Sequence, residues 1–133
     1  MTSLVLPDTS VWSRRHQPAV ADELATAIEA DRVATVLPIV LELLRSGRDV
    51  HEARDQEEEL RGLHELPVTA RVAAKARETI VRLAENGQHR GPSPTDLIAA
   101  AAAELSGAEL WHCDRHFELI AAVTGQPMRR VGE

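Results

Sequence analysis

Four acidic residues stand at positions from which a folded chain could bring their carboxylates together. Each adjoins a run of apolar residues, the pattern of a buried element, and the four are Asp8, Glu42, Asp96 and Asp114. Gathered carboxylates repel each other, and a hard cation relieves that repulsion. A cation held only by oxygen ligands suits phosphate chemistry, because it polarises a phosphoryl oxygen and acidifies a bound water. The spacing therefore indicates a divalent-metal site, with Mg²⁺ or Mn²⁺ as the expected cofactor.

Three of these acids also have an explanation that requires no site. Asp8 and Asp114 each precede an expected helix, where a carboxylate can accept hydrogen bonds from the first free N–H groups. Asp96 lies three residues after Ser93, the spacing of a capping box. For these residues, capping and a site role remain equal alternatives. Glu42 differs, because its apolar neighbours predict a half-buried helix face, and an unpaired buried carboxylate is costly. A site role is therefore the preferred interpretation of Glu42.

The elements that must position these acids alternate between strand and helix. We expect strands at 3–7, 33–36, 66–68, 109–112 and 128–131. We expect helices from residue 10, over 19–30, from 38 to about 47, and over 49–63, 69–85, 96–105 and 115–124. The alternation predicts an α/β fold with a central, mainly parallel sheet covered on both faces. In such sheets ligands bind beyond the carboxyl ends of the strands, where all four acids would meet.

Length and composition narrow the class of protein. The 133 residues, 44% of them apolar, fit one domain over 1–133 with a real core. No run is long enough to span a bilayer and no signal peptide opens the chain, so no membrane partner is expected. The single cysteine, Cys113, excludes an internal disulfide and fits a reducing, cytoplasmic location.

The net charge of -6 is unusual for a protein that binds nucleic acid. Bound metal would offset part of it, and every basic residue except Lys75 is arginine, which matches phosphate with a planar pair of donors. Codon bias in a GC-rich genome is the preferred explanation of the arginine excess. Two tryptophans and one phenylalanine are too few for a platform of stacked bases, so a nucleic acid would have to be recognised by its shape and phosphates.

Four stretches of the chain resemble the PIN-domain ribonucleases, and specifically the VapC-type toxins of bacterial toxin–antitoxin modules. They are residues 5–12 (VLPDTSVW), 38–43 (PIVLEL), 93–101 (SPTDLIAAA) and 110–117 (LWHCDRHF). Their order and spacing agree with that family along the whole chain. The resemblance implies a PIN-like three-layer α/β/α sandwich and a metal-dependent endoribonuclease toxin whose acidic quartet is Asp8, Glu42, Asp96 and Asp114.

The resemblance also implies supporting residues and partners. Thr9 or Ser10 matches a hydroxyl that often supports the first acid, and His116 stands where some relatives carry a further acid, which argues against a second tightly held metal. The implied partners are an RNA substrate, often transfer RNA, a VapB-type antitoxin and a second copy of the toxin in a homodimer.

The mechanism we expect uses one divalent ion. Mg²⁺ held by Asp8, Asp96 and Asp114 would polarise the scissile phosphate while Glu42 orients the attacking water, giving 5′-phosphate and 3′-hydroxyl ends. Arg115 could contact a substrate phosphate, although a solvated helix residue explains it slightly better. Four more arginines could steer the RNA backbone, namely Arg14, Arg15, Arg45 and Arg48.

Other functions remain as alternatives. A receiver-like phospho-acceptor signalling domain would share the length and the sheet, but it usually needs paired acids after the first strand and a lysine near a late strand, and Lys75 lies within an expected helix. A catalytically inactive binding module is disfavoured by the intact set of acids. A zinc site at His112, Cys113 and His116 is disfavoured because neighbouring residues on a strand face opposite sides.

Overall fold

The computed structural model describes residues 3–132, and its strands form one parallel sheet. The strands are β1 (Val5–Pro7), β2 (Ala34–Val36), β3 (His64–Leu66), β4 (Glu109–His112) and β5 (Met128–Arg130). Strand β4 pairs with β1 and β5, while β2 pairs with β3, all in parallel. A parallel bridge between Val5 and Val33 joins the two sets, so the strand order is β3-β2-β1-β4-β5. The predicted central parallel sheet is confirmed.

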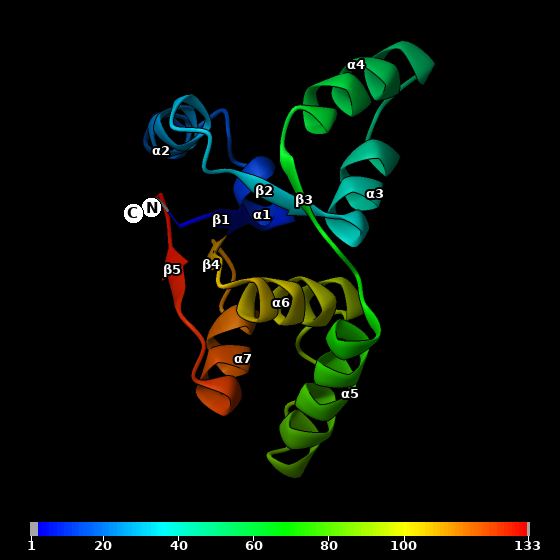
Figure 1. Cartoon of the computed structure of the whole chain (residues 1–133), viewed down its shortest axis with the longest axis vertical. Helices are drawn as coiled ribbons and strands as arrows, with labels where there is room; N and C mark the ends of the chain where they lie inside the picture. Colours follow the sequence, from blue (N-terminus) through cyan, green and yellow to red (C-terminus); the bar gives the residue numbers. More distant parts are fainter. Residues whose placement is uncertain (1–2, 133) are drawn as a thin grey trace.

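Helices cover both faces of this sheet. They are α1 (Thr9–Trp12), α2 (Pro18–Glu29), α3 (Leu37–Arg45), α4 (Val50–Arg61), α5 (Ala70–Glu85), α6 (Pro94–Ser106) and α7 (His116–Thr124). Figure 1 shows α5, α6 and α7 on one side of the strands, with α2, α3 and α4 on the other. The predicted three-layer sandwich is therefore confirmed. Within residues 3–132, no helix combines the length and apolarity needed to cross a membrane.

Helix α6 is the central helix of its layer. Leu97 and the alanines at 99–103 are buried, and α6 packs against β1, β3 and β4. Small side chains let a helix approach a sheet closely, which explains this run of alanines. The close contact sets the position of the first turn of α6, which carries Asp96.

Every predicted element exists, with boundaries within two residues of those observed. The third strand is one correction, because it spans His64–Leu66 and not 66–68. Pro67 follows it and cannot donate to a ladder, whereas the His64 N–H donates to the Val33 carbonyl at 3.2 Å. A second correction is α6, which begins at Pro94 and not at 96 because Ser93 caps it.

Candidate active site

The four acids lie at the carboxyl ends of the strands. Asp8 follows β1 directly, and its N–H donates to the Trp111 carbonyl of β4 at 2.9 Å. Asp114 lies two residues beyond the end of β4, Glu42 lies in α3 after β2, and Asp96 lies in the first turn of α6. The parallel sheet therefore directs all four segments to one rim, as expected.

Electrostatic coupling shows that the four carboxylates are neighbours. The negative charge of Asp96 contributes to the raised pKa of Asp8, and Asp114 and Glu42 both contribute to the raised pKa of Asp96. The Thr9 hydroxyl donates to Glu42 Oε1 at 2.7 Å, which links the segment after β1 to α3. The structure thus brings all four predicted site residues to one rim, with the charge of Asp96 coupled to those of the other three.

Capping and a site role turn out not to be exclusive for the three aspartates. Asp8 Oδ2 accepts from the Ser10 N–H at 2.9 Å, and Asp114 Oδ1 accepts from the His116 N–H at 3.0 Å. Asp96 forms a reciprocal capping box with Ser93 and accepts through Oδ2 at 2.9 Å. Each carboxylate uses one oxygen to hold its own helix end and leaves the other oxygen outside that bond.

Asp8 has the most unusual environment of the four. Its side chain is buried, with the residue 4% exposed, and Oδ1 has no hydrogen-bond partner among residues 3–132. Burial raises the pKa of Asp8 from 3.8 to about 6, against the opposing effect of the hydrogen bonds from Ser10. Burial likewise raises the pKa of Asp96. A buried carboxylate oxygen without a donor requires either a proton or a cation.

The expected burial of Glu42 is wrong. Helix α3 buries Ile39, Val40 and Leu43, whereas Glu42 is exposed, as is its neighbour Leu41 at 56% exposure. The apolar run around Glu42 covers more of the helix circumference than the core can cover, so it does not predict which face is inside. The support for a site role now comes from the contact with Thr9 and the proximity of Asp96.

The supporting residues have distinct contacts. Ser10 Oγ accepts from the Cys113 N–H at 3.0 Å, joining α1 to the segment before Asp114. This bond links residues 103 positions apart, so no local pattern in the sequence indicates it. Arg115 is exposed and has no ion pair within the part of the chain that the structure describes.

The arginines expected to steer RNA are mostly engaged elsewhere. The Arg14 guanidinium donates to the Ser10 carbonyl at 2.9 Å. The nearest nitrogen of Arg15 lies 3.6 Å from Glu59, and that of Arg48 lies 3.0 Å from Glu52. The two ion pairs reduce the positive charge that Arg15 and Arg48 present to a substrate.

The His112 ring belongs to the core and not to a metal site. It is buried, stacks on Phe117 with centroids 5.5 Å apart, and accepts from the Asp114 N–H through Nδ1 at 3.3 Å. Burial lowers its pKa, so the neutral ring is the form that accepts this bond. His112 therefore supports the backbone at Asp114.

The donor set fits a hard divalent cation in its chemistry. Within residues 3–132, no three His, Cys, Asp or Glu side chains are already arranged as ligands around one point. The three aspartates nevertheless offer oxygen donors, and Asp8 Oδ1 is a buried acceptor without a partner in the described part of the chain. Mg²⁺ and Mn²⁺ take such oxygen donors, so the residues fit either ion.

Comparison with known proteins places this arrangement in a family context. A model of the PIN domain family matches residues 5–123. Ribonuclease VapC18 of Mycobacterium tuberculosis is 37% identical over 122 residues, which cover 90% of this chain and 89% of the relative. Ribonuclease VapC21 of the same species is 36% identical over 132 residues, covering 98% of this chain and 96% of the relative.

Solved structures show the same fold at low sequence identity. VapBC2 from Rickettsia felis, bound to a DNA fragment from its promoter, matches with a TM-score of 0.77 and 14% identity, covering 96% of this chain and 98% of the other. VapBC-5 from Mycobacterium tuberculosis matches with a TM-score of 0.63 and 23% identity, covering 99% of this chain and 100% of the other.

Proposed function

Because this chain belongs to the PIN-domain family, and within it to the VapC-type ribonucleases, we propose that it is a metal-dependent endoribonuclease toxin. The observation that carries the proposal is the acid cluster at the sheet rim, in which the buried Asp8 Oδ1 has no hydrogen-bond partner. A binding module without catalysis would have no use for so costly a group. Membership of the PIN-domain family also removes the receiver-like alternative.

Asp8, Asp96 and Asp114 are the residues that would hold Mg²⁺ or Mn²⁺. When bound there, the ion supplies Lewis-acid chemistry, polarising the scissile phosphate and acidifying the attacking water. The chain's own groups provide orientation. Thr9 fixes one oxygen of Glu42 at 2.7 Å, which leaves the second oxygen to accept a proton from that water. In-line attack on the phosphate would leave a 5′-phosphate and a 3′-hydroxyl.

The proposed partners follow from the relatives. The structural neighbours include VapBC assemblies and a toxin–antitoxin complex from Klebsiella pneumoniae, which supports a VapB-type antitoxin for this chain. We further propose that residues 1–133 act as one PIN-like domain, that the toxin forms a homodimer and that it cuts structured RNA such as transfer RNA. An RNA substrate and the single cysteine both fit the cytoplasm.

Incubation of the purified protein with total RNA tests the proposal. With Mg²⁺ we expect cleavage to fragments ending in 5′-phosphate and 3′-hydroxyl, and with EDTA we expect none. Glu42→Gln should abolish cleavage and relieve toxicity in co-expression, as should the antitoxin. Fragments ending in a 2′,3′-cyclic phosphate would contradict this mechanism, because they require attack by the RNA's own 2′-hydroxyl. Intact RNA together with antitoxin binding would instead support the inactive binding module.

A further inference from the structure

A hollow of about 390 Å³ lies beside the acid cluster on the Asp114 side. Its lining comes from the loop before α6 and from the start of α7, and consists of Gln88, Gly91, Arg115, His116, Glu118 and Leu119. His116 places it next to the site, because His116 Nδ1 lies 3.5 Å from Asp114 Oδ1. We call this hollow the Arg115 subsite.

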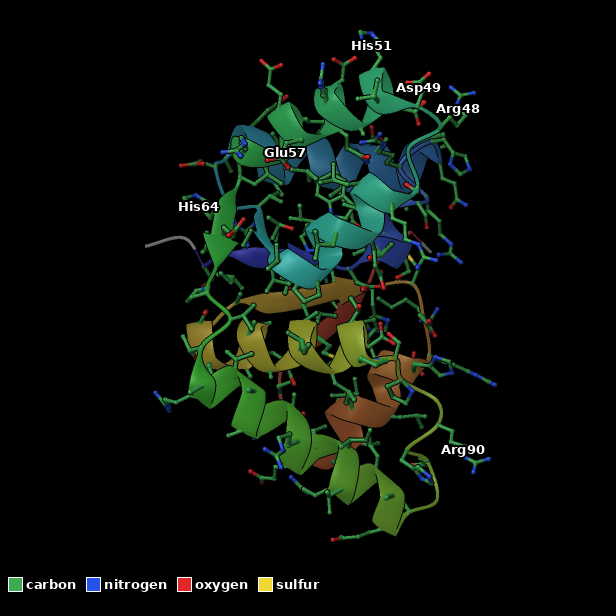
Figure 2. The ribbon with its side chains drawn as sticks, turned by 90° about the vertical axis from the view of Figure 1, so that its right-hand side faces the viewer. Arg48, Asp49, His51, Glu57, His64 and Arg90 are labelled. Atoms are coloured by element: carbon green, nitrogen blue, oxygen red, sulfur yellow. The ribbon has the colours of Figure 1, made fainter. Side chains whose placement is uncertain are left out.

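The Arg115 subsite contains a cation whose charge no carboxylate neutralises. Its one acid, Glu118, is paired with Arg130, whose Nη2 and Nε lie 2.9 and 3.2 Å from Oε1. Arg115 has no such partner within residues 3–132, so its guanidinium remains available. Figure 2 shows Arg90 on the neighbouring loop with its side chain extended away from the ribbon, so Arg90 adds positive potential without filling the hollow.

A second hollow, on the Glu42 side, has the opposite character. Its lining includes Thr9, Trp12, Arg15, Glu42 and Glu52. Arg15 is paired with Glu59 at 3.6 Å and Glu52 with Arg48 at 3.0 Å, so the negative charge of Glu42 is the one that these pairs leave unneutralised. A phosphate would therefore favour the Arg115 subsite over this one.

A glycine sets the width of the Arg115 subsite. A Cβ on Gly91 would lie 3.3 Å from His116 Cδ2 and 3.3 Å from Leu119 Cδ1, closer than most side-chain contacts. The loop approaches α7 this closely because residue 91 has no side chain. Any larger residue must displace the His116 ring or the Leu119 side chain, both of which line the hollow.

We propose that the Arg115 subsite holds the RNA segment next to the scissile phosphate, with Arg115 binding a backbone phosphate and Gly91 keeping the subsite open. The inference rests on the proposed ribonuclease function, and it adds where the RNA next to the scissile phosphate binds. A guanidinium offers paired donors that match phosphate oxygens, and most contacts to nucleic acids go to the backbone. The lining has no Phe, Tyr or Trp, so we expect contacts to the RNA backbone to contribute more here than base stacking.

The first test measures RNA affinity against salt concentration. The probe is a fluorescently labelled single-stranded RNA of random sequence, and the parent protein is Asp8→Asn with Mg²⁺, which should bind without cutting. Arg115→Ala should weaken binding roughly three- to tenfold and reduce the slope of log K against log salt by about 0.7, the value for one lost contact to a single-stranded phosphate. Arg115→Lys should restore the slope. Arg54→Ala is the matched control, because Arg54 is exposed and lies in α4.

The second test narrows the subsite without changing charge. Gly91→Ala should raise the KM of the active enzyme severalfold and change kcat much less, since none of the four acids is replaced. The control is Gly62→Ala, where a Cβ would meet only the Glu59 carbonyl at 3.4 Å. If Gly91→Ala does not fold, the RNA affinity and salt dependence of the Arg115→Ala and Arg115→Lys variants still test the proposal.

The outcomes separate the two proposals. An Arg115→Ala slope and affinity equal to those of the parent overturn the subsite, even if the wild-type protein cuts RNA. A wild-type protein that cuts no RNA with Mg²⁺ overturns the ribonuclease, whatever the slope shows.

Discussion

The two carboxylate oxygens of Asp8 have opposite effects on the stability of the folded protein. Oδ2 caps α1 by accepting from the Ser10 N–H, whereas Oδ1 is buried without a partner. Ionisation of Asp8 is therefore unfavourable in the folded protein, as its pKa of about 6 shows. The same group that opposes folding at neutral pH is the one best placed to bind a cation.

Asp8→Asn should stabilise the metal-free protein and abolish RNA cleavage. Asparagine can still cap α1 but carries no charge, and the rise in pKa from 3.8 to about 6 corresponds to at most about 3 kcal/mol at pH 7.5. Urea unfolding in EDTA measures this. Asp49→Asn is the matched control, because Asp49 caps α4 in an exposed position. An active or destabilised Asp8→Asn protein would refute the site assignment.

The pH dependence of stability follows from the same pKa. A carboxyl whose pKa is raised by folding binds its proton more tightly in the folded state. Its contribution to stability is therefore fully present below pH 3.8 and is lost as pH rises through about 6. The advantage of Asp8→Asn should accordingly shrink toward pH 4. Mg²⁺ should raise the melting temperature of the wild type at pH 7.5 and have little effect at pH 4.5, where Asp8 is protonated.

Thr9→Val tests the orientation of Glu42. The substitution keeps the shape of the side chain and removes the donor to Glu42 Oε1 at 2.7 Å. We expect kcat to fall about tenfold with a nearly unchanged melting temperature, because Glu42 is exposed and retains hydration. Thr9→Ser keeps the hydroxyl and should retain most activity. Equal kcat for the Val and Ser variants would show that the bond has no catalytic role.

At the scale of elements, the site depends on the ends of helices and strands. The hydrogen bond from the Asp8 N–H to Trp111 ties β1 to β4, and the bond from the Cys113 N–H to Ser10 Oγ ties α1 to the β4–α7 connection. These two bonds hold the backbone at Asp8 near the backbone at Asp114. The elements therefore hold the two backbone segments that carry Asp8 and Asp114 side by side.

Ser10→Ala should loosen this connection. The Cys113 N–H loses its acceptor, so we expect a loss of about 1 kcal/mol in unfolding free energy. We also expect a smaller rise of melting temperature on Mg²⁺ addition, because Asp8 and Asp114 are less well positioned. Ser13→Ala is the control, since the exposed Ser13 hydroxyl donates only to the Ser10 carbonyl at 3.1 Å. An identical Mg²⁺ response in both variants would argue against the positioning role.

At the scale of the whole molecule, helix α4 buries far fewer residues than helix α6. Helix α4 buries only Leu60 among its residues and packs against α3, whereas α6 buries six residues under the sheet. Figure 1 shows α4 at the far end from α5. The β2–β3 pair joins the rest of the sheet through the single bridge between Val5 and Val33. The α3–α4 end should therefore open locally more easily than the centre.

Amide hydrogen exchange should reveal this difference. We expect the amides of α4 to exchange at least about tenfold faster than those of α6, because opening α4 exposes little apolar surface. The amides of α6 should exchange only by global unfolding, which makes them the internal reference. Equal exchange rates in the two helices would show that the molecule opens as one cooperative unit.

The sequence by itself determined the elements and the rim at which the acids meet. Periodic apolar residues and capping residues are local signals, and parallel strands alternating with helices place Asp8, Asp96 and Asp114 at one edge of the sheet. Only the tertiary structure decided that Glu42 is exposed, that Ser10 holds Cys113, and that a hollow lined by Gly91 lies beside Asp114. These features depend on contacts between residues far apart in the chain, and no local pattern of residues encodes such a contact.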